Sequence, residues 1–317
     1  MSGDVFTNWT DEVTASWGKR PVKTTHGLHT SPLLSLEAIA ELIDRFPREQ
    51  YSLVSRSEVD GKRFQHEGDF GALTGKQVLD WIAAGHLWLN LRHVPLVDKR
   101  YGDLLGEAYD EMARRAPGAR MFNASLGILI SSPHAGATYH CDLPGQALWQ
   151  IHGRKRIYIY PPEPPFLRVN HLEDIALFGI EEELPYEAGY DASATVVELE
   201  PGAMAHWPLN APHRVENHGM LNISVATEHW ADDIERLHKV NLANGILRNR
   251  FGWTPRSRAV SGPGYQAKVV LQGVMRRMNW VKKTRAERRP LAFRLDGTRP
   301  GAIAAVAAPL RETAPAA

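Results

Sequence analysis

The sequence is poor in cysteine, in long apolar stretches and in net charge, and each deficit excludes a class of protein. Cys141 is the single cysteine, so no disulfide forms within the chain and nothing indicates an oxidising compartment. No run of roughly 18 apolar residues is present, and the first residues lack the apolar stretch of a signal peptide. The formal net charge of +1 gives no general attraction to nucleic acid or to a membrane surface. We therefore expect a cytoplasmic protein.

The composition is that of a folded chain with an extensive interior. Hydrophobic residues make up 43% of the 317 residues, which supports a sizeable core in one large or two modest domains. Residues 1–120 mix helix and strand signals and are predicted to form an α+β segment that packs on the core. Helices are expected within it at residues 36–43, 74–84 and 98–115, each bounded by a capping residue, a glycine or a proline.

The rest of the chain divides into a β-rich part and a helical part. Residues 121–232 carry short strand patterns separated by proline and glycine, which predict a mainly β fold with flanking helices, a double-stranded β-helix or jelly roll. Residues 163–193 form an acidic insert in this core, interpreted as a lid, a substrate-facing loop or a plain surface excursion. Residues 233–294 are predicted to be a helical segment, and residues 295–317, rich in Ala, Pro and Gly, a disordered tail.

The most informative motif is His140-Cys141-Asp142. Successive side chains of a strand point to opposite faces, so His140 and Asp142 project together. His213 begins a later strand-like run, and two histidines with one carboxylate on neighbouring strands would hold a metal ion from one side. This leaves positions for a substrate and for dioxygen, which is the arrangement of non-haem iron(II) oxygenases. His206 is the competing candidate for the distal ligand.

Two further strand patterns follow the motif, at residues 146–151 and 155–160. Strand parity places Lys155 on the same face as two isoleucines. A lysine on an apolar face is costly unless an anion meets it, and a dicarboxylate cosubstrate would supply that anion. Gln146 lies close after the motif and is expected to contact a cosubstrate or a substrate.

The stretch from about Ser125 to Trp230 resembles the catalytic domain of the JmjC-type, cupin-like 2-oxoglutarate and Fe(II)-dependent oxygenases. It is most similar to the asparaginyl hydroxylase and ribosomal-oxygenase branch. The resemblance is carried by short motifs in the order and at the separations of that family: Tyr139-His140-Cys141-Asp142, residues 149–156, Pro161-Pro162, Leu199-Glu200-Pro201-Gly202, Trp207-Pro208 and residues 212–217. Residues 17–22 resemble the segment through which an N-terminal strand joins the core in that branch, and an ordinary tryptophan anchor is the alternative.

The resemblance implies a set of roles and a reaction. His140, Asp142 and His213 would bind iron(II) and form the catalytic centre, and Lys155 would hold the distal carboxylate of 2-oxoglutarate. The reaction would use dioxygen and couple oxidative decarboxylation of 2-oxoglutarate, to succinate and carbon dioxide, with hydroxylation of a C–H bond.

The sequence departs from the family in its finer contacts. Ala203 replaces an acid that often precedes the last ligand, and His206 stands where an aromatic residue is common. A threonine that often touches the cosubstrate is displaced by one position, to Thr138. Thr138 and Gln146 are therefore further candidate cofactor-binding residues.

The substrate class is the least determined part of this interpretation. A protein or peptide side chain is favoured, because the resemblance is greatest to members that hydroxylate proteins, and a small metabolite is the alternative. A metal-binding cupin that does not use 2-oxoglutarate and a non-catalytic jelly-roll protein also remain open. No membrane partner is expected, nucleic acid is disfavoured despite the basic residues between 276 and 289, and a homodimer is left open.

Overall fold

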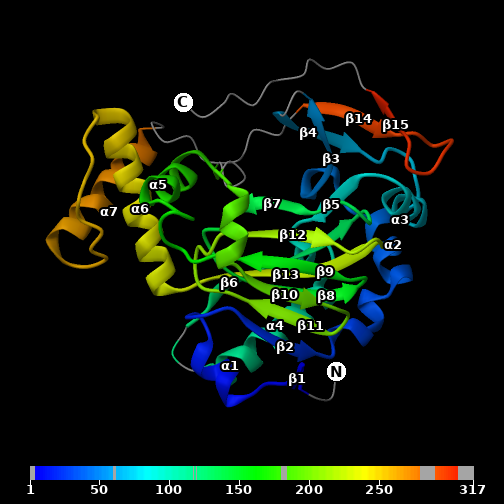
Figure 1. Ribbon diagram of the computed structural model, residues 1–317, viewed down its shortest axis with the longest axis horizontal. Coiled ribbons are helices and arrows are strands. Elements are labelled where there is room, and N and C mark those ends of the chain that lie inside the picture. Colours follow the sequence, from blue (N-terminus) through cyan, green and yellow to red (C-terminus); the bar gives the residue numbers. More distant parts are fainter. Residues whose placement is uncertain are drawn as a thin grey trace.

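The structure is a computed structural model of the chain. It describes residues 4–59, 62–116, 118, 120–179, 184–278 and 290–305. Two sheets with helices around them make up these parts of the chain (Figure 1). No helix within the described ranges is long and apolar enough to cross a membrane.

Eight antiparallel strands form the centre of the molecule and confirm the predicted double-stranded β-helix. They are β6 (Phe122–Ser131), β7 (Ala137–His140), β8 (Gly145–His152), β9 (Lys155–Ile159), β10 (Thr195–Leu199), β11 (Ala203–His206), β12 (His213–Asn217) and β13 (Asn222–Trp230). Four of them are neighbours in a large sheet, in the order β11-β8-β13-β6, and the other four form a small sheet, in the order β10-β9-β12-β7. Because the chain passes between the two sheets in this order, the strands form a jelly roll.

The large sheet continues beyond the jelly roll at both of its edges. On one side β2 (Val22–His26) pairs with β11, and β1 (Phe6–Asn8) pairs with β2. An N-terminal strand therefore does join the core. On the other side β5 (Leu87–Leu91), β3 (Tyr51–Val59) and β4 (Lys62–Asp69) extend the sheet from β6. The strands of the N-terminal segment therefore belong to the same eleven-stranded sheet as the strands of the jelly roll.

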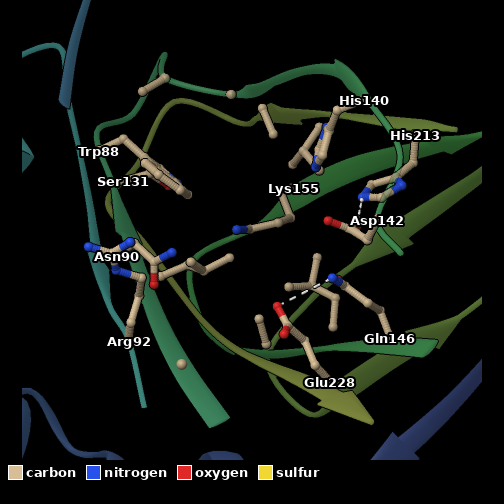
Figure 2. A pocket seen from close by; sticks show the side chains of 18 of the residues that line it. Trp88, Asn90, Arg92, Ser131, His140, Asp142, Gln146, Lys155, His213 and Glu228 are labelled. Carbon is tan, nitrogen blue, oxygen red and sulfur yellow. Dashed lines mark hydrogen bonds and ion pairs between the residues drawn. The ribbon is translucent and has the colours of Figure 1, made fainter. Parts of the chain in front are cut away.

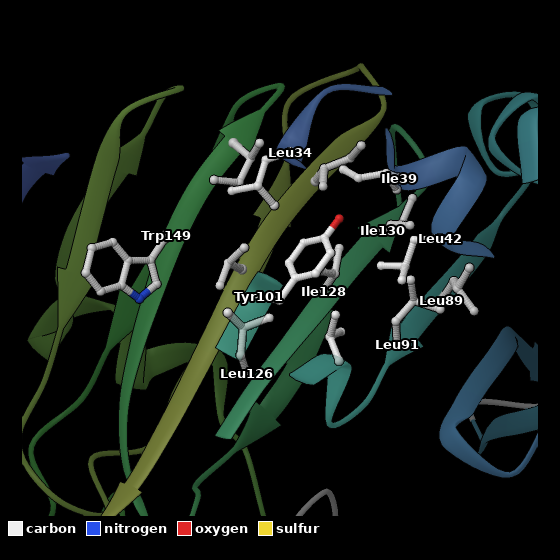
Figure 3. Packing of buried hydrophobic residues seen from close by; sticks show 14 of the residues in the cluster. Leu34, Ile39, Leu42, Leu89, Leu91, Tyr101, Leu126, Ile128, Ile130 and Trp149 are labelled. Carbon is white, nitrogen blue, oxygen red and sulfur yellow. The ribbon is translucent and has the colours of Figure 1, made fainter. Parts of the chain in front are cut away.

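Helices of the N-terminal segment cover one face of the large sheet. They are α1 (Asp11–Ser16), α2 (Leu36–Asp44), α3 (Gly75–Ala84) and α4 (Lys99–Arg115). The last three coincide with the predicted helices because Ser35, Thr74 and Asp98 cap them, each accepting a hydrogen bond from a backbone N–H of the first turn. Buried side chains of α2 and α4 pack on those of β5, β6 and β8 (Figure 3), which forms the main hydrophobic core.

A second and smaller hydrophobic cluster lies between the two sheets of the jelly roll. Leu148 of the large sheet meets Ile157 and Ile159 of the small sheet there, together with Leu199 and Trp207. This cluster fills one part of the space between the sheets, and a cavity lined by polar side chains occupies another part.

The insert between β9 and β10 lies on the outer face of the small sheet. It contains α5 (Val169–Phe178) and a short 3-10 helix (Ala188–Ser193), and its apolar residues pack on Tyr139 and Tyr160. Arg214 of β12 forms an ion pair with Asp191 at 2.5 Å and so fixes the end of the insert. The acidic residues 181–183 lie outside the described residues.

The C-terminal part contains strands as well as the predicted helices. Two helices, α6 (Asp232–Phe251) and α7 (Gly262–Arg277), lie beside α5, away from α2 and α3 (Figure 1). The first contains Gly245 in its interior and is ended by Gly252 in the left-handed conformation. β14 (Leu291–Leu295) pairs with β4, where a helix was expected, and β15 (Ile303–Ala305) lies within the expected tail. Residues 306–317 lie outside the described residues.

The approach of β7 to β12 gives a first prediction. A side chain at Gly136, just before β7, would place its Cβ 2.0 Å from the backbone oxygen of Val215 in β12. We expect Gly136→Ala to force these strands apart and to lower the free energy of unfolding by about 1–3 kcal/mol in urea titrations. Gly189→Ala is the control, because nothing lies within 4 Å of its Cβ. Equal unfolding free energies of the two variants would contradict this account.

Candidate metal centre

Three predicted ligands come together at one end of the small sheet. His140 ends β7 and lies opposite His213, the first residue of β12, while Asp142 follows β7 by two residues. The imidazole rings of His140 and His213 lie 4.3 Å apart between centroids, and Nε2 of His213 is 3.3 Å from Oδ2 of Asp142. One ligand atom from each residue lies within 4.8 Å of the others, and no other such group of His, Cys, Asp or Glu occurs among the described residues.

Backbone carbonyls fix the tautomers of both histidines. Nδ1 of His140 bonds to the oxygen of Thr138 at 2.6 Å, and Nδ1 of His213 bonds to the oxygen of Ala211 at 3.1 Å. A carbonyl oxygen can only accept, so each Nδ1 carries a proton, and Nε2 is the ring atom through which each histidine could bind a metal ion. Burial, and then the neighbouring His140, lower the pKa of His213 well below its usual value, so its ring is neutral.

This arrangement fits a divalent metal ion. The unprotonated Nε2 of neutral His213 faces a carboxylate oxygen of Asp142 across 3.3 Å, which places two electron-pair donors against each other. A cation bound by both atoms would replace this repulsion with attraction. Two neutral imidazoles and one carboxylate on one side of the ion are the ligand set of non-haem iron(II) sites, and the Nδ1 contacts provide the usual orientation.

The three ligands open into a cavity of about 290 Å³ between the sheets (Figure 2). Its walls come from both sheets of the jelly roll and from β5 of the N-terminal segment. Its polar lining includes Asn90, Arg92, Ser131, Gln146, Lys155, Asn217 and Glu228.

Lys155 is buried in this cavity and is only 4% exposed. It starts β9 on the face that Ile157 and Ile159 share, as strand parity predicts, and its amine points into the space between the three ligands and β5 (Figure 2). The described residues offer it no acidic partner. Loss of hydration therefore lowers the pKa of its amine to about 7. An anion entering the cavity would find a desolvated cation site.

Gln146 and Glu228 line the cavity beside Asp142 (Figure 2). They are cross-strand partners on β8 and β13, and the Gln146 amide nitrogen donates to the Glu228 carboxylate at 3.5 Å. Desolvation by the cavity walls, with a further contribution from Asp142, raises the pKa of Glu228 to about 7. Gln146 thus lies in the cavity where it was expected, whereas nothing in the sequence singled out Glu228.

Two other candidates lie outside the cavity. Thr138 does not line it, and contributes the backbone oxygen that holds His140. His206 belongs to the opposite face of the large sheet, where its ring stacks on Trp17 at 3.9 Å and its Nδ1 bonds to the backbone oxygen of Gln146. His206 is not one of the residues whose ligand atoms lie within 4.8 Å of one another.

Some lining residues come from regions that no motif marked. Trp88, Asn90 and Arg92 reach the cavity because β5 pairs with β6 in the large sheet. The alternation of side chains along β5 is visible in the sequence and predicts a strand, but it does not show which strand β5 pairs with. The described part of the 163–193 insert contributes no lining residue and packs on the outer face of the small sheet.

Comparison with known proteins finds similar solved structures at low sequence identity. No family model and no curated protein matches the chain. The ribosomal oxygenase YcfD of Escherichia coli, in complex with cobalt and 2-oxoglutarate, has a TM-score of 0.49 and 18% identity over 93% of this chain and 75% of that chain. An X-ray structure of YcfD has a TM-score of 0.49 and 20% identity over 86% and 68% of the two chains. YcfD with cobalt and succinic acid has a TM-score of 0.47 and 18% identity, covering 93% and 75%.

The buried amine of Lys155 gives a prediction about stability. Its pKa is about 7 in the folded chain and 10.5 as the reference value, so between these limits the unfolded chain binds more protons. Stability should therefore rise with pH across that window, and the cost of the buried charge should be fully present below pH 7. We expect Lys155→Met to be more stable than the parent in urea at pH 6.5 and to lose this pH dependence.

The control for that measurement is Arg156→Met. Arg156 is the next residue in β9, faces the other way and pairs with Glu198 on the surface. Its removal should leave the slope of stability against pH unchanged. A parent slope that survives in Lys155→Met would show that another group titrates in this range.

Proposed function

We propose that the protein is an iron(II)- and 2-oxoglutarate-dependent oxygenase that hydroxylates an unactivated C–H bond. The proposal is supported chiefly by one juxtaposition: a two-histidine, one-carboxylate group and a buried lysine without an acidic partner among the described residues share one cavity. The two-histidine, one-carboxylate group suits a metal ion, and the lysine suits the distal carboxylate of a dicarboxylic acid. Binding of 2-oxoglutarate to iron(II) in this cavity would use both.

The metal ligands in this proposal are His140, Asp142 and His213. When bound there, iron(II) would supply the oxidation of substrate by dioxygen, coupled to conversion of 2-oxoglutarate to succinate and carbon dioxide. The chain's own contribution is to hold three donor atoms on one side of the ion, which leaves the cavity side for ligands. Asn210 supports this arrangement, since its amide donates to the backbone oxygen of Asp142 at 2.7 Å.

Lys155 is the proposed anchor of the cosubstrate. A charge-assisted hydrogen bond between its ammonium and a carboxylate is stronger in a site from which water is excluded. The apolar side chains around it, including Leu148 and Trp207, provide that exclusion. Pairing with a carboxylate would also return the pKa of Lys155 toward its ordinary value.

A protein or peptide side chain is the proposed substrate. Glu228, Arg92 and His93 line the cavity and are exposed, so they form a polar rim accessible from outside. The cavity of about 290 Å³ must hold the cosubstrate, which leaves room near the metal for a single side chain rather than a whole large metabolite. A metal-binding cupin without 2-oxoglutarate is the alternative class, and formation of succinate separates the two.

A prediction concerns the metal ligands. We expect His140→Ala, Asp142→Ala and His213→Ala each to abolish 2-oxoglutarate-dependent succinate formation and to weaken binding of cobalt(II) measured by calorimetry, because three ligands are needed to hold the ion. His134→Ala, at an exposed histidine, should do neither. Retained turnover in His213→Ala with loss in His206→Ala would overturn the choice of distal ligand.

A further prediction concerns the cosubstrate. Lys155→Ala removes the cation that meets the distal carboxylate, and loss of one partner of a buried pair costs about 3–5 kcal/mol. We expect the concentration of 2-oxoglutarate needed for half-maximal succinate formation to rise at least about a hundredfold. Cobalt(II) affinity should change little. Arg156→Ala is the matched control, and the same loss in this variant would contradict the assignment of Lys155.

A further inference from the structure

The residues next to the two histidine ligands point away from the cavity, toward the insert 163–193. The imidazoles of His140 and His213 enter the cavity (Figure 2), and successive side chains of a strand alternate between its two faces. Tyr139 and Arg214 therefore lie on the outer face of the small sheet. Tyr139 is 3% exposed there and the side chain of Arg214 is 13% exposed, because the insert contacts both.

Asp191 joins the insert to β9 and β12. Its carboxylate forms the ion pair with Arg214 at 2.5 Å and accepts a hydrogen bond from the Tyr160 hydroxyl at 2.6 Å. Tyr160 follows β9, and its backbone N–H donates to the oxygen of Pro212, the residue before His213. One carboxylate thus holds the chain on both sides of His213, directly through Arg214 and through Tyr160 on the other side.

Tyr139 joins the same insert to β7. Its hydroxyl donates to the backbone oxygen of Phe166 at 2.8 Å. Its ring lies 5.0 Å from that of Tyr160 between centroids, so it contacts a residue that Asp191 also binds. The contacts behind the two histidines therefore meet in one group of side chains.

The hydrogen bonds of the small sheet give β7 little support of its own. The strand has four residues, lies at the edge of the sheet, and has an irregular register with β12 between His213 and Val215. An edge strand is paired on one side only, and an irregular register leaves part of it unpaired. The insert supplies a second support, from behind, for the strand that ends at His140.

We propose that Asp191 and Tyr139 are positioning residues, through which the insert fixes the separation of His140 and His213 for metal binding. This rests on the proposed function, because the two histidines are its metal ligands. Neither positioning residue lines the cavity, so each acts through the strand beside a ligand. Groups that orient a ligand from outside affect the affinity and the coordination geometry of the ion.

The test compares two ion pairs of the same insert. Asp191→Ala breaks the pair with Arg214 behind the ligands. Asp174→Ala is the matched control, because Asp174 pairs at 2.6 Å with Arg248, which lies on α6 rather than on the small sheet. The parent and each variant, as full chains, are titrated with cobalt(II) by calorimetry. The visible absorption bands of the bound cobalt(II) are also recorded, since they report the number and arrangement of its ligands.

The two variants should differ in metal binding rather than in stability. We expect Asp191→Ala to weaken cobalt(II) binding at least about fivefold, less than the roughly 10–100-fold loss typical of a group bonded directly to a ligand. Its absorption bands should shift as well. Asp174→Ala should keep the affinity and the spectrum of the parent, even where thermal unfolding shows a similar loss of stability in both variants. This difference separates positioning of the ligands from a contribution to folding alone.

Two milder variants decide the question if Asp191→Ala does not fold. Asp191→Asn keeps an acceptor for the Tyr160 hydroxyl, and its cobalt(II) affinity should lie between those of the parent and Asp191→Ala. Tyr139→Phe keeps the ring and loses the bond to Phe166, and should weaken binding in the same direction. Parent affinity and spectrum in Asp191→Ala, or in both milder variants, would overturn the inference, and so would equal changes in Asp174→Ala.

Failure of this inference differs from failure of the proposed function. If the parent chain binds no cobalt(II), the proposed function fails and the inference fails with it. If the parent binds cobalt(II), and forms succinate when loaded with iron(II), but the Asp191 variants behave like the Asp174 control, the positioning role alone is wrong.

Discussion

The antiparallel register of β7 with β12 is the constraint on which the site depends. It places His140 opposite His213, and the chain leaving β7 then brings Asp142 within 3.3 Å of the second imidazole. A shift by one residue would turn the ligands to opposite faces of the sheet. The two strands approach each other closely at Gly136, where no side chain fits. The arrangement of the proposed metal ligands thus depends on strand pairing as much as on residue identity.

The site is also a place where folding and function make opposite demands. A lysine buried without an acidic partner among the described residues is unfavourable for the isolated chain, yet the same desolvation would make it a strong partner for a carboxylate. The neutral histidine facing a carboxylate is a second such case. In the proposed function, a metal ion would relieve the second conflict and a dicarboxylate the first. These two arrangements are unfavourable for folding, and such exceptions are expected at functional sites.

Short-range rules predicted the parts of this structure that are determined locally. Capping residues defined three helices, and the two-residue period placed Lys155 on the apolar side of β9. Features that depend on distant pairing were not predictable in this way. The strand β14 owes its conformation to β4, more than two hundred residues earlier, and Asn90 reaches the cavity through the pairing of β5 with β6. Glu228 belongs to no motif, and its place in the cavity wall follows from its neighbours across two strand pairs.

The position of β13 in the large sheet has a consequence for the order in which the protein can assemble. β13 is the last strand of the jelly roll in sequence, yet it lies between β6 and β8 and pairs with both. A nascent chain that ends before residue 222 therefore has no strand to join these two, and the central sheet stays divided although nearly all its strands have been made. Closure must wait for contacts that span about a hundred residues, which is the kind of long-range pairing that makes folding slow. Until that strand arrives, the edges of β6 and β8 that it pairs with remain open, and unpaired strand edges of this kind favour association with other chains.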